Sequence, residues 1–381
     1  MTLKAAGRGL IPPFIVMDVM RAAAERAAAG HDVLHLEVGQ PSTGAPRKAV
    51  EAAKRALDAD PLGYTLAFGL DRLRERIAEH YRASYQVAVD PANVVVTTGS
   101  SGAFVLSFLA AFEAGDRVGL ASPGYPAYRN ILASIGVEPV LIPVGPASGF
   151  QPTVDILKAR GERLDGLILA SPSNPTGSMV SPTALAALSD WCTAEGVRLI
   201  SDEIYHGLTY EQTAATAAGR GGAVVINSFS KYFSMTGWRL GWMVLPDDLL
   251  RSVECLGQNL FISPPTLSQH AAIAVFDCLD ELDANVARYA RNREILLAEL
   301  PSAGFERLAP ADGAFYLYAD VSRWTDNSLA FCRRMLEETG VACTPGVDFD
   351  PFEGHRHLRL SFAGATEDMI EAARRLKAWR K

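Results

Sequence analysis

The sequence is poor in cysteine, in long apolar runs and in basic residues. Its five cysteines are scattered and show neither metal-binding nor disulfide spacing, which favours a reducing compartment; they are Cys192, Cys255, Cys278, Cys332 and Cys343. No apolar run approaches the ~18 residues of a membrane-spanning helix, and no signal-peptide core follows the first residues. These absences predict a cytoplasmic protein that makes no use of a membrane.

Charge and composition exclude further classes of partner. The 381 residues carry a net charge of −7, so there is no electrostatic case for binding nucleic acid or an anionic membrane. The seven histidines are dispersed, and the pair His355 and His357 has no third ligand beside it, so we expect no metal site. A content of 49% apolar and 21% charged residues is typical of an ordinary soluble globular protein of two or three domains.

Short, apolar, β-branched segments alternate with helical stretches from Asn93 onward. Seven of them are predicted strands: residues 94–98, 117–121, 138–142, 166–170, 197–201, 223–227 and 240–245. Such strands are typical of a mostly parallel sheet that is buried on both faces. We therefore predict an α/β fold with a mostly parallel seven-stranded sheet sandwiched by helices in a large domain, residues 46–285. Residues 286–381 mix strands and helices and indicate a smaller α+β domain, to which residues 1–45, an arm with further elements, return.

Polar motifs follow the ends of the predicted strands, where parallel sheets place their ligand-binding loops. Lys231 comes just after strand 223–227, and a buried lysine tends to lose its proton. A neutral amine can form a Schiff base with a carbonyl cofactor. The hydroxyls of Ser228 and Ser230 and the guanidinium of Arg239 could hold a phosphate. This combination suggests pyridoxal 5′-phosphate (PLP); the alternative is a surface lysine in a loop.

Three further motifs each allow two interpretations. The Gly-Ser-Ser-Gly segment with Ser100 and Ser101 opens a helix, whose amides bind phosphate or simply receive an N-cap. Tyr125 could stack on a flat ring or fill the core. Asn174 lies in a proline-rich loop and could donate to an anionic oxygen or serve only the turn.

Two charged residues complete the candidates. Asp202 follows a buried strand, where a carboxylate is costly unless it meets a cation such as a protonated pyridine. Tyr205 could then donate to a phenolate, although a helix N-cap explains the carboxylate equally well. Arg359 alternates with leucines on a predicted strand. Its side chain therefore either faces water or binds a substrate carboxylate through a bidentate contact.

The order of these motifs is more specific than any one of them. It runs through Asn174-Pro-x-Gly177, Asp202-x-x-Tyr205 and Ser228-x-Ser-Lys231 to Arg239 and Arg359. In this order the chain resembles the class I/II aminotransferases, which are fold-type I PLP enzymes of the aspartate aminotransferase superfamily. The resemblance covers essentially the whole chain, from the N-terminal arm to the last helix.

The resemblance implies a role for each candidate. Lys231 would hold PLP as a Schiff base and move the substrate proton, Asp202 would pair with the pyridine nitrogen, and Tyr205 and Asn174 would bond the ring oxygen. Tyr125 would stack on the ring. The phosphate would be bound by Ser100, Ser101, Ser228, Arg239 and Tyr64 of the partner subunit in a homodimer. The substrate carboxylate would be held by Arg359, Asn174 and the Gly39 backbone, and the bonds Ser122–Pro123 and Asn174–Pro175 would be cis.

One departure from the family bears on the substrate. Dicarboxylate-specific relatives place a cation near the positions of Gln258 and Asn259 or of Ser101, and this chain has none there. Apolar residues are frequent in the segments that would cover the substrate side chain: Leu10, Ile11, Phe14, Ile15, Phe261 and Ile262. We expect an aminotransferase that acts on an α-amino acid with a neutral side chain and a 2-oxo acid. A PLP-dependent carbon–sulfur β-lyase and a non-catalytic PLP-binding regulatory module are the alternatives.

Overall fold

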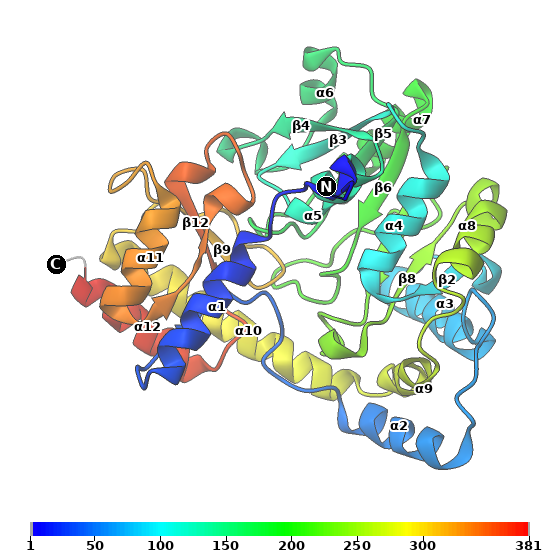
Figure 1. The fold of residues 1–381 in the computed structure, drawn as a ribbon, viewed down its shortest axis with the longest axis horizontal. Helices are drawn as coiled ribbons and strands as arrows, with labels where there is room; N and C mark the ends of the chain where they lie inside the picture. Colours follow the sequence, from blue (N-terminus) through cyan, green and yellow to red (C-terminus); the bar gives the residue numbers. More distant parts are fainter. Residues whose placement is uncertain (1–2, 380–381) are drawn as a thin grey trace.

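A seven-stranded sheet forms the centre of the protein in the computed structural model, which describes residues 3–379 (Figure 1). The strands lie in the order β2-β8-β7-β6-β5-β3-β4. They are β2 (Val94–Thr97), β3 (Arg117–Ser122), β4 (Glu138–Pro143), β5 (Gly166–Ala170), β6 (Arg198–Asp202), β7 (Val224–Ser228) and β8 (Gly241–Val244). Strand β8 is antiparallel to both of its neighbours, and the other pairs are parallel. The predicted α/β fold is confirmed.

Helices cover both faces of this sheet because its strands are apolar on both sides. In β2, Val94 and Val96 pack into one hydrophobic cluster and Val95 packs into another, since successive side chains of a strand point to opposite faces. The first cluster includes α3 (Asp71–Tyr85), α6 (Val154–Arg160), α7 (Pro182–Glu195) and α9 (Thr266–Val275). The second includes α4 (Gly99–Ala111), α5 (Pro126–Ser134) and α8 (Asp247–Leu260).

The C-terminal part of the chain forms a smaller antiparallel sheet. Its strands β9 (Tyr316–Asp320), β11 (Thr344–Pro345) and β12 (His357–Ser361) lie in the order β11-β12-β9. The helices α11 (Ser328–Thr339) and α12 (Thr366–Trp379) belong to the same part of the molecule, and α10 (Leu279–Glu299) leads to it from α9 (Figure 1).

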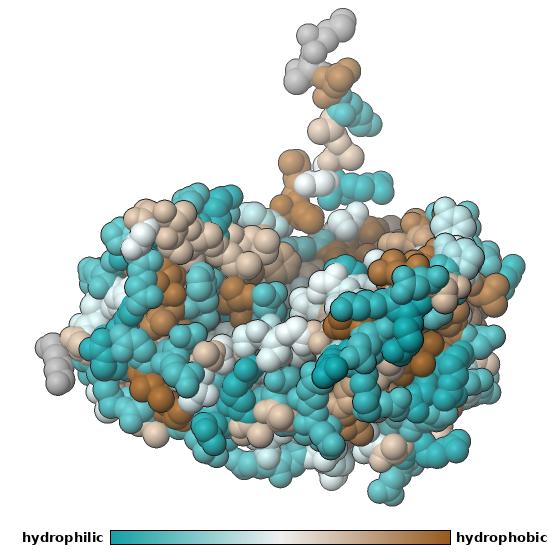
Figure 2. Space-filling model, turned by 90° about the horizontal axis from the view of Figure 1, so that it is seen from below, coloured by the Kyte–Doolittle hydropathy of each residue, from teal (hydrophilic) through white to brown (hydrophobic). Residues whose placement is uncertain are grey.

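The N-terminal residues return to this smaller sheet. Helix α1 (Ile15–Ala28) lies against β10 (Val341–Ala342) and β11. Between α1 and α2, the strand β1 (Leu34–His35) pairs in parallel with the two-residue strand β10. Helix α2 (Arg47–Ala59) then packs against α9. Ahead of α1, the first described residues stand clear of the body of the protein (Figure 2).

Among residues 3–379, three peptide bonds are cis, and all precede proline at or after strand ends. Ser122–Pro123 and Asn174–Pro175 agree with the prediction, and Ser171–Pro172 is a third that was not predicted. Within residues 3–379, no helix combines the length and the apolar character that crossing a bilayer requires. The loops that contain these prolines line the candidate site.

Candidate active site

A cavity of about 250 Å³ lies at the carboxyl ends of the parallel strands, bounded by the start of α1 and by β12. Ten of the predicted site residues line it: Gly39, Ser100, Ser101, Tyr125, Asn174, Asp202, Tyr205, Lys231, Arg239 and Arg359. They come from the loops and the helix start that follow β2, β3, β5 and β7, from the end of β6 and the turn after it, from the segment after β1, and from β12. The structure therefore brings together residues that are far apart in the sequence.

Lys231 extends its amine into this cavity from the loop after β7. Its Nζ donates a hydrogen bond to the main-chain oxygen of Gly39 at 2.6 Å and lies 5.7 Å from the centre of the Tyr205 ring. Burial, together with the charges of Arg359 and Arg239, lowers the pKa of Lys231 to about 8. A substantial fraction of the amine is therefore neutral near physiological pH, as attack on an aldehyde requires.

Asp202 ends β6 with its carboxylate buried among fixed donors. Tyr128 donates its hydroxyl hydrogen to one oxygen, and the main-chain N–H of Ile204 donates to the other at 3.1 Å. Burial raises the pKa of Asp202 to about 6, and these two donors oppose the rise. Tyr128 was not predicted, although it lies one helical turn after Tyr125 and so belongs on the same side of α5.

The two terminal nitrogens of the Arg359 guanidinium are anchored by hydrogen bonds, whereas its Nε is not. Arg359 donates to Oδ1 of Asn174 at 2.9 Å and to the main-chain oxygen of Glu37 at 2.7 Å. Its Nε is buried and has no partner among residues 3–379. The guanidinium carbon lies 4.3 Å from the centre of the Tyr316 ring. A planar cation that is fixed in place and keeps a free donor is suited to binding a carboxylate.

Tyr316 is a second lining residue that was not predicted. Its hydroxyl lies 2.8 Å from the hydroxyl of Tyr205, so it joins the Arg359 side of the cavity to the Lys231 side. A Cβ atom at Gly39 would lie 3.1 Å from Cζ of this ring and closer still to its hydroxyl. Only glycine therefore fits at position 39 without displacing Tyr316.

The N-terminus of α4 and the side chain of Arg239 form a cationic corner. Gly99 begins the helix with a φ of +67°, and a Cβ there would lie 3.0 Å from Cζ of Arg239. Ser100 and Ser101 occupy the first turn, and the hydroxyl residue Thr236 also lines the cavity. Free amides, hydroxyls and a guanidinium together form a typical phosphate-binding set.

Two predicted residues do not line this cavity. Ser228 is buried, and its hydroxyl donates to the main-chain oxygen of Leu240 at 3.4 Å and accepts from the N–H of Ser230 at 3.1 Å. Ser230 lines the cavity instead. Tyr64 is 82% exposed and was predicted to act on the partner subunit. Both roles stay predictions.

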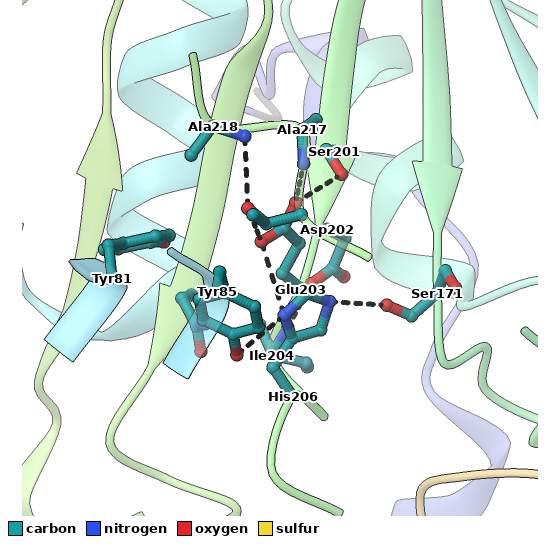
Figure 3. Close-up of polar contacts among 12 residues, drawn as sticks. Tyr81, Tyr85, Ser171, Ser201, Asp202, Glu203, Ile204, His206, Ala217 and Ala218 are labelled. Carbon is teal, nitrogen blue, oxygen red and sulfur yellow. Dashed lines mark hydrogen bonds and ion pairs between the residues drawn. The ribbon is translucent and has the colours of Figure 1, made fainter. Parts of the chain in front are cut away.

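A buried polar network lies next to Asp202 and includes Ser171, Glu203 and His206 (Figure 3). Nε2 of His206 lies 3.1 Å from the main-chain oxygen of Ser171. Because a carbonyl oxygen can only accept a hydrogen bond, Nε2 carries the hydrogen. Burial lowers the pKa of His206 to about 3, so the ring is neutral and Nδ1 accepts from the Tyr85 hydroxyl at 3.0 Å. His206 thus fastens one loop to the other.

Glu203 completes this network on the side of the sheet opposite Asp202. Its carboxyl group accepts from the Ser201 hydroxyl at 3.0 Å, the Thr216 hydroxyl at 2.8 Å and the Ala217 N–H at 2.7 Å. Burial raises the pKa of Glu203 to about 7, and these donors oppose the rise. With all these partners, Glu203 fixes the backbone next to Asp202 while its own side chain stays outside the cavity.

The comparisons with known proteins identify the family of this chain. Residues 31–376 match the family model for aminotransferase class I and II. A valine–pyruvate aminotransferase from Mycobacterium tuberculosis is 52% identical over 384 residues, which cover 100% of this chain and 99% of the relative. The crystal structure of an aminotransferase from the same organism has a TM-score of 0.97 at 52% identity and covers 99% of each chain. An aspartate aminotransferase from Thermus thermophilus, solved with maleate, has a TM-score of 0.92 at 30% identity and covers 99% of this chain and 100% of its own.

The chain therefore belongs to the class I and II aminotransferases. It is a PLP-dependent enzyme that moves an amino group between an α-amino acid and a 2-oxo acid. The residues of the cavity fit this cofactor: a buried amine for its aldehyde, a buried carboxylate for its pyridine nitrogen and a cationic helix N-terminus for its phosphate. The relatives are named as aminotransferases, so the lyase and the regulatory module are set aside.

Proposed function

We propose that this enzyme exchanges the amino group between a neutral, apolar amino acid such as valine and a small oxo acid such as pyruvate. The Mycobacterium tuberculosis relative is named for this pair. The observation that carries the proposal is the apolar wall at the start of α1, which presents Phe14, Val16, Met17 and Met20 to the cavity. A distal carboxylate buried against this wall would cost several kcal/mol to desolvate without a cation.

We assign each lysine and arginine of the cavity lining to a group other than the substrate side chain. Among the described residues, Lys231, Arg239 and Arg359 are the lysine and arginines that line it. Lys231 is assigned to the cofactor aldehyde, Arg239 to the phosphate corner and Arg359 to the substrate α-carboxylate. No lysine or arginine of the described lining is therefore left to pair with a second substrate carboxylate.

The proposed mechanism assigns the reacting groups to this chain. Lys231 would hold PLP through its amine, and the same amine, when free, would take the proton from the substrate Cα and later return it. When bound, PLP supplies an electron sink for the pair left on Cα. Asp202, held by Tyr128, would pair with the pyridine N–H of the cofactor and keep that proton in place. Asn174 uses Oδ1 for Arg359, so its Nδ2 is free to donate to the cofactor ring oxygen, together with Tyr205.

The remaining residues position the two ligands. Tyr125 would stack on the cofactor ring, and Arg359, Asn174 and the Gly39 backbone would hold the substrate carboxylate. The phosphate is assigned to Ser100, Ser101, Ser228, Arg239 and Tyr64 of the partner subunit. With the substrate carboxylate and amine both fixed, the Cα–H bond would face Lys231, so the proton would pass to the Lys231 amine.

We further propose a cytoplasmic homodimer in which each active site is completed by the other subunit. Large apolar side chains near the site are exposed, with Tyr64 at 82%, Leu66 at 72% and Ile262 at 51%, and clustered exposed apolar groups mark interaction surfaces. Residues 1–45 and 286–381 would form the small domain and residues 46–285 the large, PLP-binding domain. Sedimentation at micromolar concentration should give twice the chain mass; a monomer that is fully active would contradict the shared site.

A panel of amino donors tests the function. With pyruvate as the common acceptor, kcat/KM is measured for valine, alanine, methionine, phenylalanine and aspartate, and product amino acid is compared with released ammonia. The expected result is a preference for neutral donors with stoichiometric amino transfer. Aspartate ahead of all neutral donors by more than about tenfold, about 1.4 kcal/mol, would contradict the proposed substrate class.

A further inference from the structure

Asp348 is a buried carboxylate at the cavity that the mechanism does not use. It follows β11 and is 2% exposed. Its Oδ1 accepts from the N–H of Ile15 at 3.1 Å and its Oδ2 from the N–H of Val16 at 3.2 Å, across more than 300 residues of sequence. These are the first two amides of α1, so Asp348 caps the helix whose start forms the apolar wall.

The groups around Asp348 can stabilise its carboxylate in the charged form, but no cation forms an ion pair with it among the described residues. Arg129 approaches from α5, yet it donates to the main-chain oxygen of Asp348 at 2.7 Å and not to the carboxylate. Burial raises the pKa of Asp348, while the amides of Ile15 and Val16 and the charges of Arg359 and Arg129 oppose the rise. Two amide donors and the positive end of a helix dipole can hold an ionised carboxylate.

The position of this charge relative to the substrate follows from the cavity. Lys231 and Arg359 fix the amine and the α-carboxylate, so the substrate side chain extends toward the remaining lining. Phe14, Val16 and Met17 form that lining on the side of α1, and Asp348 lies beside them. An anionic side chain that enters there meets an apolar wall and a charge of its own sign, which is strongly unfavourable.

We propose that Asp348 determines the substrate class by its charge: it repels any second carboxylate that enters beside the start of α1. The enzyme then selects α-amino acids with neutral side chains and the matching oxo acids, and it discriminates against glutamate and aspartate. This inference rests on the proposed function, because it assumes that the substrate side chain faces α1.

The test compares the isosteric, uncharged variant Asp348→Asn with wild type. The measured quantity is kcat/KM for valine divided by kcat/KM for glutamate, with pyruvate as acceptor. We expect this ratio to fall by at least about tenfold in Asp348→Asn, because the repulsion of the glutamate side chain is removed. Asp348→Ser, a shorter neutral acceptor, serves where circular dichroism shows that Asp348→Asn is unfolded, and it carries the same expectation.

Two controls separate charge from capping. Asp18→Asn removes the same charge from the first turn of the same helix, but Asp18 is exposed and does not line the cavity, so the ratio should not change. Ile15→Pro removes one of the two donors to Asp348 and keeps its charge; proline suits the first position of a helix, and the wild-type ratio should persist.

An unchanged ratio in Asp348→Asn, with activity lost equally for both donors or not at all, would overturn the proposal. So would an Ile15→Pro variant that lowers the ratio as much as Asp348→Asn, since Asp348 would then act only as a cap. A wild-type enzyme that prefers glutamate to valine would contradict the proposed function, whereas the proposal concerns only the change between wild type and variant.

Discussion

Replacing His206 with leucine should destabilise the protein by leaving buried polar groups without partners. In the native structure, Nε2 of His206 donates to the main-chain oxygen of Ser171 and Nδ1 accepts from the hydroxyl of Tyr85. A buried acceptor that loses its donor costs about 1–3 kcal/mol. Tyr85 is only partly buried, so the loss of its hydrogen bond to His206 should add less to this cost. Against a total stability of about 5–15 kcal/mol, this is a large fraction.

Urea denaturation of the cofactor-free protein measures this loss directly. His206→Leu should lower the unfolding free energy by about 1–3 kcal/mol. It should also lower kcat/KM, because the loop of Asn174 is no longer fastened to the loop of Tyr205. His206→Gln keeps an N–H that can reach the Ser171 oxygen, so it should recover most of both quantities.

A matched variant on the other side of the ring separates the two hydrogen bonds. Tyr85→Phe removes only the hydroxyl that donates to Nδ1, and it should cost less than His206→Leu. Because the two residues share one network, the double variant should cost less than the sum of the single ones. A His206→Leu protein as stable as wild type, or a glutamine variant no better than leucine, would refute the role given to the Ser171 contact.

Four further outcomes follow from the cavity. Lys231→Ala should leave no borohydride-reducible link between cofactor and protein, as measured by mass spectrometry; a retained link would mean that another amine holds PLP. Cofactor loading should accelerate as the pH rises through about 8, since only the neutral amine of Lys231 reacts and its pKa is lowered to about 8; a rate independent of pH between 6 and 9, roughly the span of that titration, would contradict this. Asp202→Asn should bind PLP yet lose most of kcat, and wild-type kcat would refute its role. Arg359→Gln should lower kcat/KM for amino acids by about 30-fold to several thousand-fold, the effect of removing one partner of a buried charge pair; an equal loss for amines without a carboxylate would make Arg359 structural.

Local patterns in the sequence were sufficient for the sheet and for most of the cavity. The strands are continuous apolar segments, and ligand loops follow strand ends in any parallel sheet. Tyr316 and Asp348 were not predicted because their roles depend on partners more than 100 residues away, Tyr205 and Ile15. The Ser-x-Ser pair could not be resolved from sequence alone, because the end of β7 sets how its hydroxyls point: Ser230 lines the cavity, and the Ser228 hydroxyl donates to the main-chain oxygen of Leu240.

The capping of α1 by Asp348 has a consequence for how the enzyme is made. The seven strands of the large sheet lie between residues 94 and 244, so they can pair while the rest of the chain is still on the ribosome. The wall of the substrate cavity cannot form at that stage, because Ile15 and Val16 bind Asp348, which is synthesised more than 300 residues later. In the same way, β1 has no partner until β10 has been synthesised. Closing so long a loop is slow. A nascent chain therefore contains Lys231, to which we assign the cofactor, well before the wall that we propose for substrate selection can form.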